Sequence, residues 1–211
     1  GVEPRFRPQE PRAARALVAA QYGLTGSYLL FVGTLEPRKN LRRLLLAYRR
    51  LLQVRGGAAC PPLVVAGAPG WWTDVLHRAV RRLGLEARVR FLGRVPDEHL
   101  PALYSTATVF VYPSLYEGFG LPPLEALACG APVITSNCSA LPEVVGDAAL
   151  QVDPRDVAAL ADALDRLLSD EQTRQVLASR GPAQAARFTW ARTAAATVAV
   201  YREALALWAR R

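Results

Sequence analysis

Methionine is absent from the 211 residues, and lysine occurs once, as Lys39. Without a methionine at its start, the chain is expected to follow further residues in the natural gene product. No apolar run approaches the roughly 18 residues of a membrane span, and residues 1–20 lack the charged-then-apolar layout of a signal peptide. We therefore expect a soluble chain.

Residues that bind metals or form disulfides are few. The three cysteines, Cys60, Cys129 and Cys138, have no C-x-x-C spacing, which argues against a disulfide framework and a zinc site and favours a reducing compartment. The two histidines, His77 and His99, have no further ligands at metal-binding spacing around them. We expect no metal site.

Positive charge exceeds negative charge, since 26 Lys and Arg against 18 Asp and Glu give a formal net charge of +8. The arginines are scattered over almost every segment, which argues against a nucleic-acid-binding stripe and indicates a solvated basic surface. A diffuse attraction for anionic ligands or membrane headgroups stays open. The hydrophobic share of 51% is enough for a large core. At about 100–200 residues per domain, the length allows one large α/β domain or two small ones, but not two full Rossmann-type domains.

Short apolar runs alternate with longer amphipathic segments along most of the chain. This alternation indicates βαβ units and a parallel sheet, whose ligands bind at the carboxyl ends of the strands. After the last strand the pattern contains helices alone, and the final helix carries one apolar stripe. We expect strands at 28–32, 62–66, 88–92, 108–112, 132–135 and 149–152, and helices at 10–21, 40–54, 71–83, 97–106, 120–129, 155–168, 170–186 and 190–209.

A segment that could bind phosphate, Gly-Thr-Leu-Glu-Pro-Arg-Lys-Asn at 33–40, follows the first expected strand. Gly33 lets a ligand approach the backbone, and Arg38 and Lys39 beside a helix start could hold two phosphates. The segment is not a P-loop, because Asn follows Lys39, and the dinucleotide fingerprint G-x-G-x-x-G is absent. A basic pair at a helix start is more often a solvated surface feature, and this alternative stays open.

A second segment, Glu-Gly-Phe-Gly-Leu-Pro-Pro-Leu-Glu at 117–125, follows the strand expected at 108–112. Glycines on both sides of Phe119 permit unusual dihedrals and expose amide groups that can hold an anion. Glu117 in the loop and Glu125 about one turn into the helix could point to the same crevice, where a carboxylate can accept two hydroxyl hydrogen bonds from a ribose or a sugar. The alternative makes Glu125 a solvated helix residue and Glu117 a helix-start anion. We favour the functional interpretation.

Further along the chain, Leu92-Gly93-Arg94-Val95 and Ser139-Ala140-Leu141-Pro142-Glu143 accompany these two segments. In this order and spacing, the four blocks resemble the C-terminal half of the retaining GT-B glycosyltransferases of the group 1 family. The resemblance extends to both ends of the chain. Residues 1–8 are similar to the segment that enters the C-terminal domain, and Phe188-Thr189-Trp190 with the amphipathic tail resembles the final helix that packs onto the N-terminal domain.

The resemblance implies a fold and its boundaries. The fold would be a Rossmann-like α/β domain, a six-stranded parallel sheet flanked by helices, with C-terminal helices, as one half of a GT-B fold. Residues 1–10 would be the remnant of an interdomain linker, and residues 11–188 the donor-nucleotide-binding domain. Residues 189–211 would be a helix that crosses to the N-terminal domain.

The resemblance also assigns roles to single residues. Arg38 and Lys39 would hold the donor diphosphate and stabilise the charge that grows on the leaving nucleotide. Glu117 would face the donor sugar, and Glu125 would take the ribose hydroxyls. Arg94 and Val95 would lie beside the nucleobase, and Gly33 and Thr34 would line the sugar-phosphate side. The sugar and diphosphate would also face the backbone amides of Gly118, Phe119, Gly120 and Leu121. Many relatives have an arginine where Thr34 stands, which leaves one phosphate contact open.

The partners implied are a nucleoside-diphosphate sugar as donor, with no cofactor, and a glycan or lipid-linked acceptor. Pro37–Asn40 and Ser139–Val145 resemble the mannosyl- or rhamnosyl-transferring subgroup, which implies GDP-mannose as a donor and polysaccharide biosynthesis as the setting. We expect a cytoplasmic protein, peripheral at the inner face of the membrane, that binds no nucleic acid. Asp-x-Asp, the usual pattern of metal-dependent sugar transferases, does not occur, so we expect a metal-independent reaction.

Two other functions stay open, a non-catalytic sugar-nucleotide-binding or interaction module on the same scaffold and, more remotely, a sugar epimerase. Arg38, Lys39, Glu117 and Glu125 are all present, and a degenerate module would usually have lost at least one of them. In the family the acceptor site belongs to the N-terminal domain. We therefore expect the isolated chain to bind nucleotide and to transfer little or no sugar.

Overall fold

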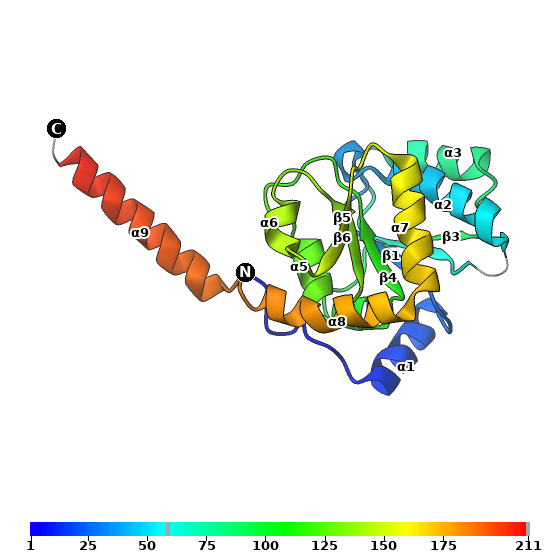
Figure 1. The fold of residues 1–211 in the computed structure, drawn as a ribbon, viewed down its shortest axis with the longest axis horizontal. Coiled ribbons are helices and arrows are strands. Elements are labelled where there is room, and N and C mark those ends of the chain that lie inside the picture. Colours follow the sequence, from blue (N-terminus) through cyan, green and yellow to red (C-terminus); the bar gives the residue numbers. More distant parts are fainter. Residues whose placement is uncertain (58–59, 210–211) are drawn as a thin grey trace.

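The computed structural model describes residues 1–57 and 60–209, and within them the chain forms an α/β fold around one parallel sheet (Figure 1). All of the expected strands are present within one residue of their predicted ends. The strands are β1 (Leu29–Val32), β2 (Leu63–Ala66), β3 (Val89–Gly93), β4 (Val109–Tyr112), β5 (Val133–Ser136) and β6 (Ala149–Val152). The helices are α1 (Pro11–Tyr22), η1 (Pro37–Lys39), α2 (Leu41–Arg55), α3 (Thr73–Arg82), α4 (Leu100–Thr106), α5 (Leu121–Ala128), α6 (Leu141–Val145), α7 (Val157–Ser169), α8 (Glu171–Ala185) and α9 (Trp190–Trp208).

The strand order is β3-β2-β1-β4-β5-β6, and neighbouring strands pair in parallel. The order reverses between β1 and β4, where Leu29 pairs with Val109 and Leu30 with Phe110. In open α/β sheets, ligands bind at such a switch point, in the crevice outside the carboxyl ends of the strands. The topology therefore directs attention to the loops that follow β1 and β4.

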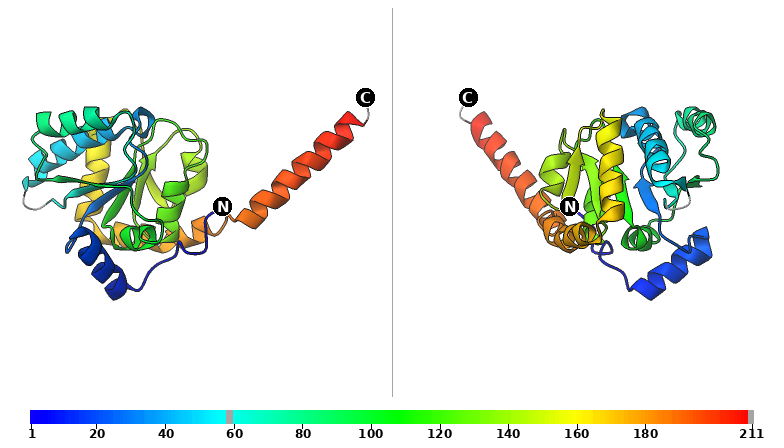
Figure 2. Two further views of the ribbon diagram at one scale, coloured as in Figure 1. Left: turned by 180° about the vertical axis from the view of Figure 1, so that it is seen from behind. Right: turned by 45° about the vertical axis from the view of Figure 1, so that its right-hand side comes forward.

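The sheet is covered by helices on both faces. On one face α2 packs against α3 and α7, and on the other α4 packs between α1 and α5, while α8 packs against α5 and α6 (Figures 1 and 2). Every residue of β1, β2, β4 and β5 is buried, as continuous apolar runs in a parallel sheet require, whereas the outer strands β3 and β6 are partly exposed. The core thus holds β1 and β4 rigidly beneath the loops that follow them.

Two glycines allow the chain to leave β1 and β2 close together. A Cβ atom on Gly67 would lie 2.0 Å from the carbonyl oxygen of Gly33, and Gly67 has φ +155°. No other residue type fits this contact, because any side chain would overlap backbone that cannot move aside. The path of the chain from β1 into residues 34–40 therefore requires a glycine at position 67, outside that segment.

The expected helices differ from the observed ones at two places near strand ends. The helix expected at 40–54 is present as α2, shifted by one residue, and a 3₁₀ turn that was not predicted precedes it; Asn40, with left-handed φ of 61°, separates the two. The segment 97–99 forms a turn in which the His99 amide donates to the Pro96 carbonyl, and α4 begins at Leu100. The helix α6 was not predicted, because its five residues are too short for a periodic pattern.

The final helix α9 projects away from the rest of the molecule, as all the views show (Figures 1 and 2). None of its residues is buried, and apolar side chains that include Tyr201, Leu205 and Trp208 face solvent. The chain start lies beside the start of this helix, where the Val2 amide donates to the Phe188 carbonyl. In the described part of the chain, no helix has the length and apolar character needed to cross a membrane.

Candidate functional site

The loops after β1 and β4 meet at the switch point of the sheet. The Leu115 amide donates to the Arg38 carbonyl at 2.8 Å, and Ser114 Oγ lies 2.9 Å from the same oxygen. The buried side chain of Asn40 joins the two loops by donating through Nδ2 to the carbonyl of Pro113 at 2.9 Å. Asparagine suits this position because it tolerates the left-handed backbone better than most residues. These contacts fix Arg38 and Lys39 against the loop that carries Glu117.

Three of the residues predicted from sequence, Arg38, Lys39 and Glu117, lie in direct contact. Lys39 Nζ lies 2.7 Å from Glu117 Oε1, and Arg38 Nη1 lies 2.8 Å from Glu117 Oε2. The Lys39 and Glu117 side chains are each 8% exposed, whereas that of Arg38 is 46% exposed. One carboxylate thus holds a buried and an exposed cation side by side. Two adjacent cations on this edge of the sheet are suited to bind an anionic ligand.

Two further side chains, from β4 and the loop after it, hold the Glu117 carboxylate. The hydroxyls of Tyr112 and Ser114 donate to Oε1 at 2.9 and 2.7 Å, and the Glu117 amide donates to Ser139 Oγ at 3.1 Å. Lys39 Nζ also contacts the Tyr112 hydroxyl and lies 4.9 Å from the centre of its ring. The carboxylate is fully surrounded by donors, as a buried charge requires.

The protonation states follow from these contacts. Burial acts to raise the pKa of Glu117, but the hydrogen bonds from Lys39 and Ser114 outweigh it and leave that pKa below its usual value. Burial, followed by the nearby Glu117 charge, raises the pKa of the Tyr112 hydroxyl far above its usual value. At neutral pH, Glu117 is therefore ionised and Tyr112 remains a donor.

The Gly-Phe-Gly loop continues from this cluster into α5. Gly118 is exposed, and Phe119 packs edge-on against Phe188 with ring centres 5.6 Å apart. Gly120 has φ +109°, and a Cβ atom there would lie 2.7 Å from the Leu141 side chain. Pro122 and Pro123 have no N–H, so in the first turn of α5 it is Leu121 that offers a backbone amide.

Glu125 lies in a second polar environment. Tyr104 donates its hydroxyl to Glu125 Oε2 at 3.0 Å, and burial raises the pKa of this carboxyl above its usual value. The charged groups that act on it are Arg5, Asp97 and Glu3, all outside the cluster around Glu117. The two glutamates therefore do not share one set of polar contacts.

The other predicted site residues lie at the carboxyl ends of β1 and β3. Gly33 follows β1 directly, and Thr34 beside it is exposed. Arg94 and Val95 follow β3, the former exposed and the latter buried. They share the strand-end edge of the sheet with the cluster of Arg38, Lys39 and Glu117.

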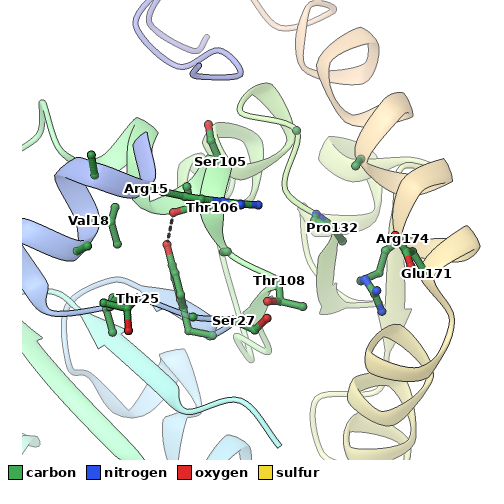
Figure 3. A pocket seen from close by; sticks show the side chains of 18 of the residues that line it. Arg15, Val18, Thr25, Ser27, Ser105, Thr106, Thr108, Pro132, Glu171 and Arg174 are labelled. Carbon is green, nitrogen blue, oxygen red and sulfur yellow. Dashed lines mark hydrogen bonds between the residues drawn. The ribbon is translucent and has the colours of Figure 1, made fainter. Parts of the chain in front are cut away.

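A cavity of about 780 Å³ lies at the opposite edge of the sheet (Figure 3). It is lined by residues that precede β1, β4 and β5 and by side chains of α1 and α8, among them Ser27, Thr108 and Arg174. None of the predicted site residues lines it. Tyr28 and Thr106 both line it, and their hydroxyls form a hydrogen bond of 2.6 Å.

Sequence reasoning missed Tyr112, Ser114 and Tyr104, which make direct contacts with the two glutamates. Tyr112 is the last residue of β4, and a side chain with a polar tip at the carboxyl end of a buried strand is the available signal. Tyr104 lies in α4 among apolar residues and gives no such signal. Among the described residues, no group of three or more His, Cys, Asp or Glu is arranged to hold a metal ion.

Most of the chain is similar in sequence to known proteins. Residues 21–184 match the model of the family described as "Glycosyl transferases group 1". Over 176 residues the chain is 49% identical to the O-antigen chain mannosyltransferase B of Escherichia coli, covering 83% of this chain and 45% of that protein. The chain thus spans less than half the length of this relative.

Solved structures share the fold. The C-terminal domain of the group 1 family glycosyl transferase LpcC from Francisella tularensis has a TM-score of 0.75 and 27% identity, with 89% of this chain and 97% of that domain covered. Anabaena Alr3699/HepE, solved in complex with UDP and glucose, has a TM-score of 0.80 and 23% identity, with 96% of this chain and 55% of that protein covered.

Proposed function

Because this chain belongs to the glycosyl transferases group 1 family, we propose that it binds the nucleotide-sugar donor of a hexosyltransferase. The observation that carries the proposal is the contact between Arg38, Lys39 and Glu117 at the switch point of the sheet. A donor diphosphate needs cations that are already in place, and these two are held by a carboxylate with further hydrogen bonds.

In this proposal Arg38 and Lys39 bind the diphosphate and stabilise the charge on the leaving nucleotide. Thr34 has no charge to offer, so the exposed guanidinium of Arg38 supplies the second cation. Glu117 faces the donor sugar and orients both cations. The amides of Gly118, Phe119, Gly120 and Leu121 lie along the diphosphate, beside Gly33.

The nucleoside would extend away from this cluster. Glu125, held by Tyr104, would accept the ribose hydroxyls, and Arg94 and Val95 would lie beside the base. The neighbour Alr3699/HepE, described with UDP and glucose, supports a nucleotide ligand for this fold.

The relative from Escherichia coli, named a mannosyltransferase, supports mannose as the sugar and GDP-mannose as the donor. We further propose transfer with retention, without a metal, to a glycan or lipid-linked acceptor at the inner face of the membrane. This chain spans 45% of that relative, so the acceptor site would lie in the other part of the whole protein, and the 211 residues alone would transfer no sugar.

Calorimetric titration of the 211-residue chain with GDP, UDP, ADP and dTDP, without metal, tests the donor site. We expect one nucleotide to bind saturably and the variant Arg38→Ala/Lys39→Ala to lose that binding. The matched control, Arg81→Ala/Arg82→Ala, removes two adjacent exposed cations from the carboxyl end of α3 and should bind as the unmodified chain does. No binding of any of the four nucleotides, or equal binding by the two double variants, would overturn the proposal.

A further inference from the structure

The proposed phosphate site carries no net charge of its own. Besides its contact with Glu117, Arg38 forms an ion pair through Nε with Glu36 Oε2 at 2.9 Å. The cluster therefore contains two cations, Arg38 and Lys39, and two carboxylates, Glu36 and Glu117. Glu36 was not among the residues predicted from sequence, and nothing in the proposed function gives it a role.

The two carboxylates lie in different surroundings. Glu117 is 8% exposed and is held by four side-chain donors, so it is part of the framework of the site. Glu36 is 32% exposed and, among the described residues, its side chain pairs with Arg38 alone. Its charge therefore acts mainly on Arg38 and on what lies beside it.

Glu36 leaves Arg38 free to bind a ligand. The pair uses Nε, and Glu117 and the Tyr116 carbonyl accept from Nη1. Within the described residues, no acceptor contacts Nη2, which retains its two N–H donors for a phosphate. Glu36 and a bound diphosphate can thus contact the same guanidinium. The negative charge of Glu36 and the negative charge of the diphosphate then repel each other across it.

This repulsion differs between the donor and the product that the proposed reaction forms. In a nucleotide sugar each of the two phosphates carries one negative charge. Transfer forms a bond between the anomeric carbon and the acceptor hydroxyl oxygen, which loses its proton. It breaks the bond between the anomeric carbon and the terminal phosphate oxygen, and that oxygen stays on the nucleotide. The terminal phosphate then ionises a second time with a pKa near 6, which adds about one charge at pH 7.5. Coulomb repulsion by a fixed carboxylate grows in proportion to the ligand charge.

We propose that Glu36 determines ligand specificity by lowering the affinity of the site for free nucleoside diphosphate more than its affinity for the nucleotide sugar. This inference rests on the proposed donor site. Glu36 offsets the charge of Arg38, so that the product, which has the extra charge, loses more affinity than the donor does.

The variant Glu36→Gln tests the charge separately from the contact, because the amide oxygen still accepts from Arg38 Nε. Titrations at pH 7.5 would use the nucleoside diphosphate that binds the unmodified chain and the hexose conjugate of the same nucleotide. We expect Kd for the diphosphate to fall about tenfold and Kd for the conjugate about fivefold, so that their ratio changes about twofold. At pH 5.5 most of the terminal phosphate is protonated and the ratio should return toward that of the unmodified chain.

A control separates this effect from the overall charge of the molecule. Glu86→Gln makes the same change in net charge at an exposed position between α3 and β3, at the opposite edge of the sheet, and should leave both affinities unchanged. Equal changes for both ligands, weaker binding of both, or the same effect from Glu86→Gln would each overturn the role of Glu36. If such a result accompanies binding that Arg38→Ala/Lys39→Ala abolishes, the donor site stands and only the inference fails. If no nucleotide binds the unmodified chain, the donor site fails as well.

Discussion

At the scale of single residues, Glu125 combines burial with a charge that little in the fold neutralises. Burial raises its pKa above the usual 4.5, and the hydrogen bond from Tyr104 only partly offsets this. A carboxyl with a raised pKa binds its proton more tightly in the folded state than in the unfolded chain. The folded state therefore loses stability as the pH rises from about 4.5 through the folded-state pKa of Glu125.

Replacement of this carboxylate by an amide should therefore stabilise the fold. We expect Glu125→Gln to raise the free energy of unfolding at pH 7 by about 0.5–1 kcal/mol, since the amide oxygen still accepts from Tyr104. The gain should vanish below about pH 4, where both states of the unmodified protein are protonated. Urea denaturation at the two pH values measures this gain in stability, and a destabilised variant at pH 7 would contradict this account.

The variant Glu125→Gln should also bind nucleotide about tenfold more weakly if Glu125 accepts the ribose hydroxyls.

Residues that touch the candidate site were predictable to different degrees. The rule that ligands bind at strand ends drew attention to the two loops separately. The family resemblance was needed to assign Arg38, Lys39 and Glu117 to one donor site. Tyr112 and Tyr104 were missed because their rings belong to the core and only their hydroxyls reach the site. For Tyr104, which lies within a helix, the sequence does not distinguish such a tyrosine from one that simply packs.

At the scale of secondary-structure elements, the strands were predicted more accurately than the starts of the helices. Buried parallel strands are apolar throughout, and this signal has sharp ends. The break at Asn40 depends on two carbonyls far away in sequence, those of Pro113 and Pro154, which accept from its side chain. Long-range contacts of this kind leave no periodic trace in the residues around Asn40.

The junction between the ends of β1 and β2 yields a prediction at this scale. Gly67→Ala places a Cβ atom against the Gly33 carbonyl and strains a backbone with positive φ. We expect a loss of roughly 2–4 kcal/mol in the free energy of unfolding. The matched control, Gly26→Ala, meets no atom within 4 Å and should change stability by less than about 0.5 kcal/mol. Thermal denaturation of both variants measures the two changes in stability. Equal losses of stability would rule out the close contact as the cause.

At the scale of the whole molecule, the helix α9 stands apart from the domain. Since none of its residues is buried and only Trp190 lies close to the chain start at Gly1, its removal costs the remaining fold little packing. We expect a chain that ends at Thr189 to keep its melting temperature within about 2 °C, because unburied segments contribute little to stability. Amide exchange in α9 should be much faster than in β4, since an isolated helix of this length is marginal in water. Equal protection of the two elements would contradict this.

The pairing of β1 with β4 also sets the order in which the molecule can assemble during synthesis. The first half of the chain can form β3-β2-β1, but one side of β1 then has unpaired backbone groups until residues 109–112 leave the ribosome. An open, apolar strand edge is a template for mispairing with another chain. Lys39 and Glu117, 78 residues apart, make their contact at the same junction of β1 and β4. The nascent chain therefore acquires its candidate site only when β4 has paired with the aggregation-prone edge of β1.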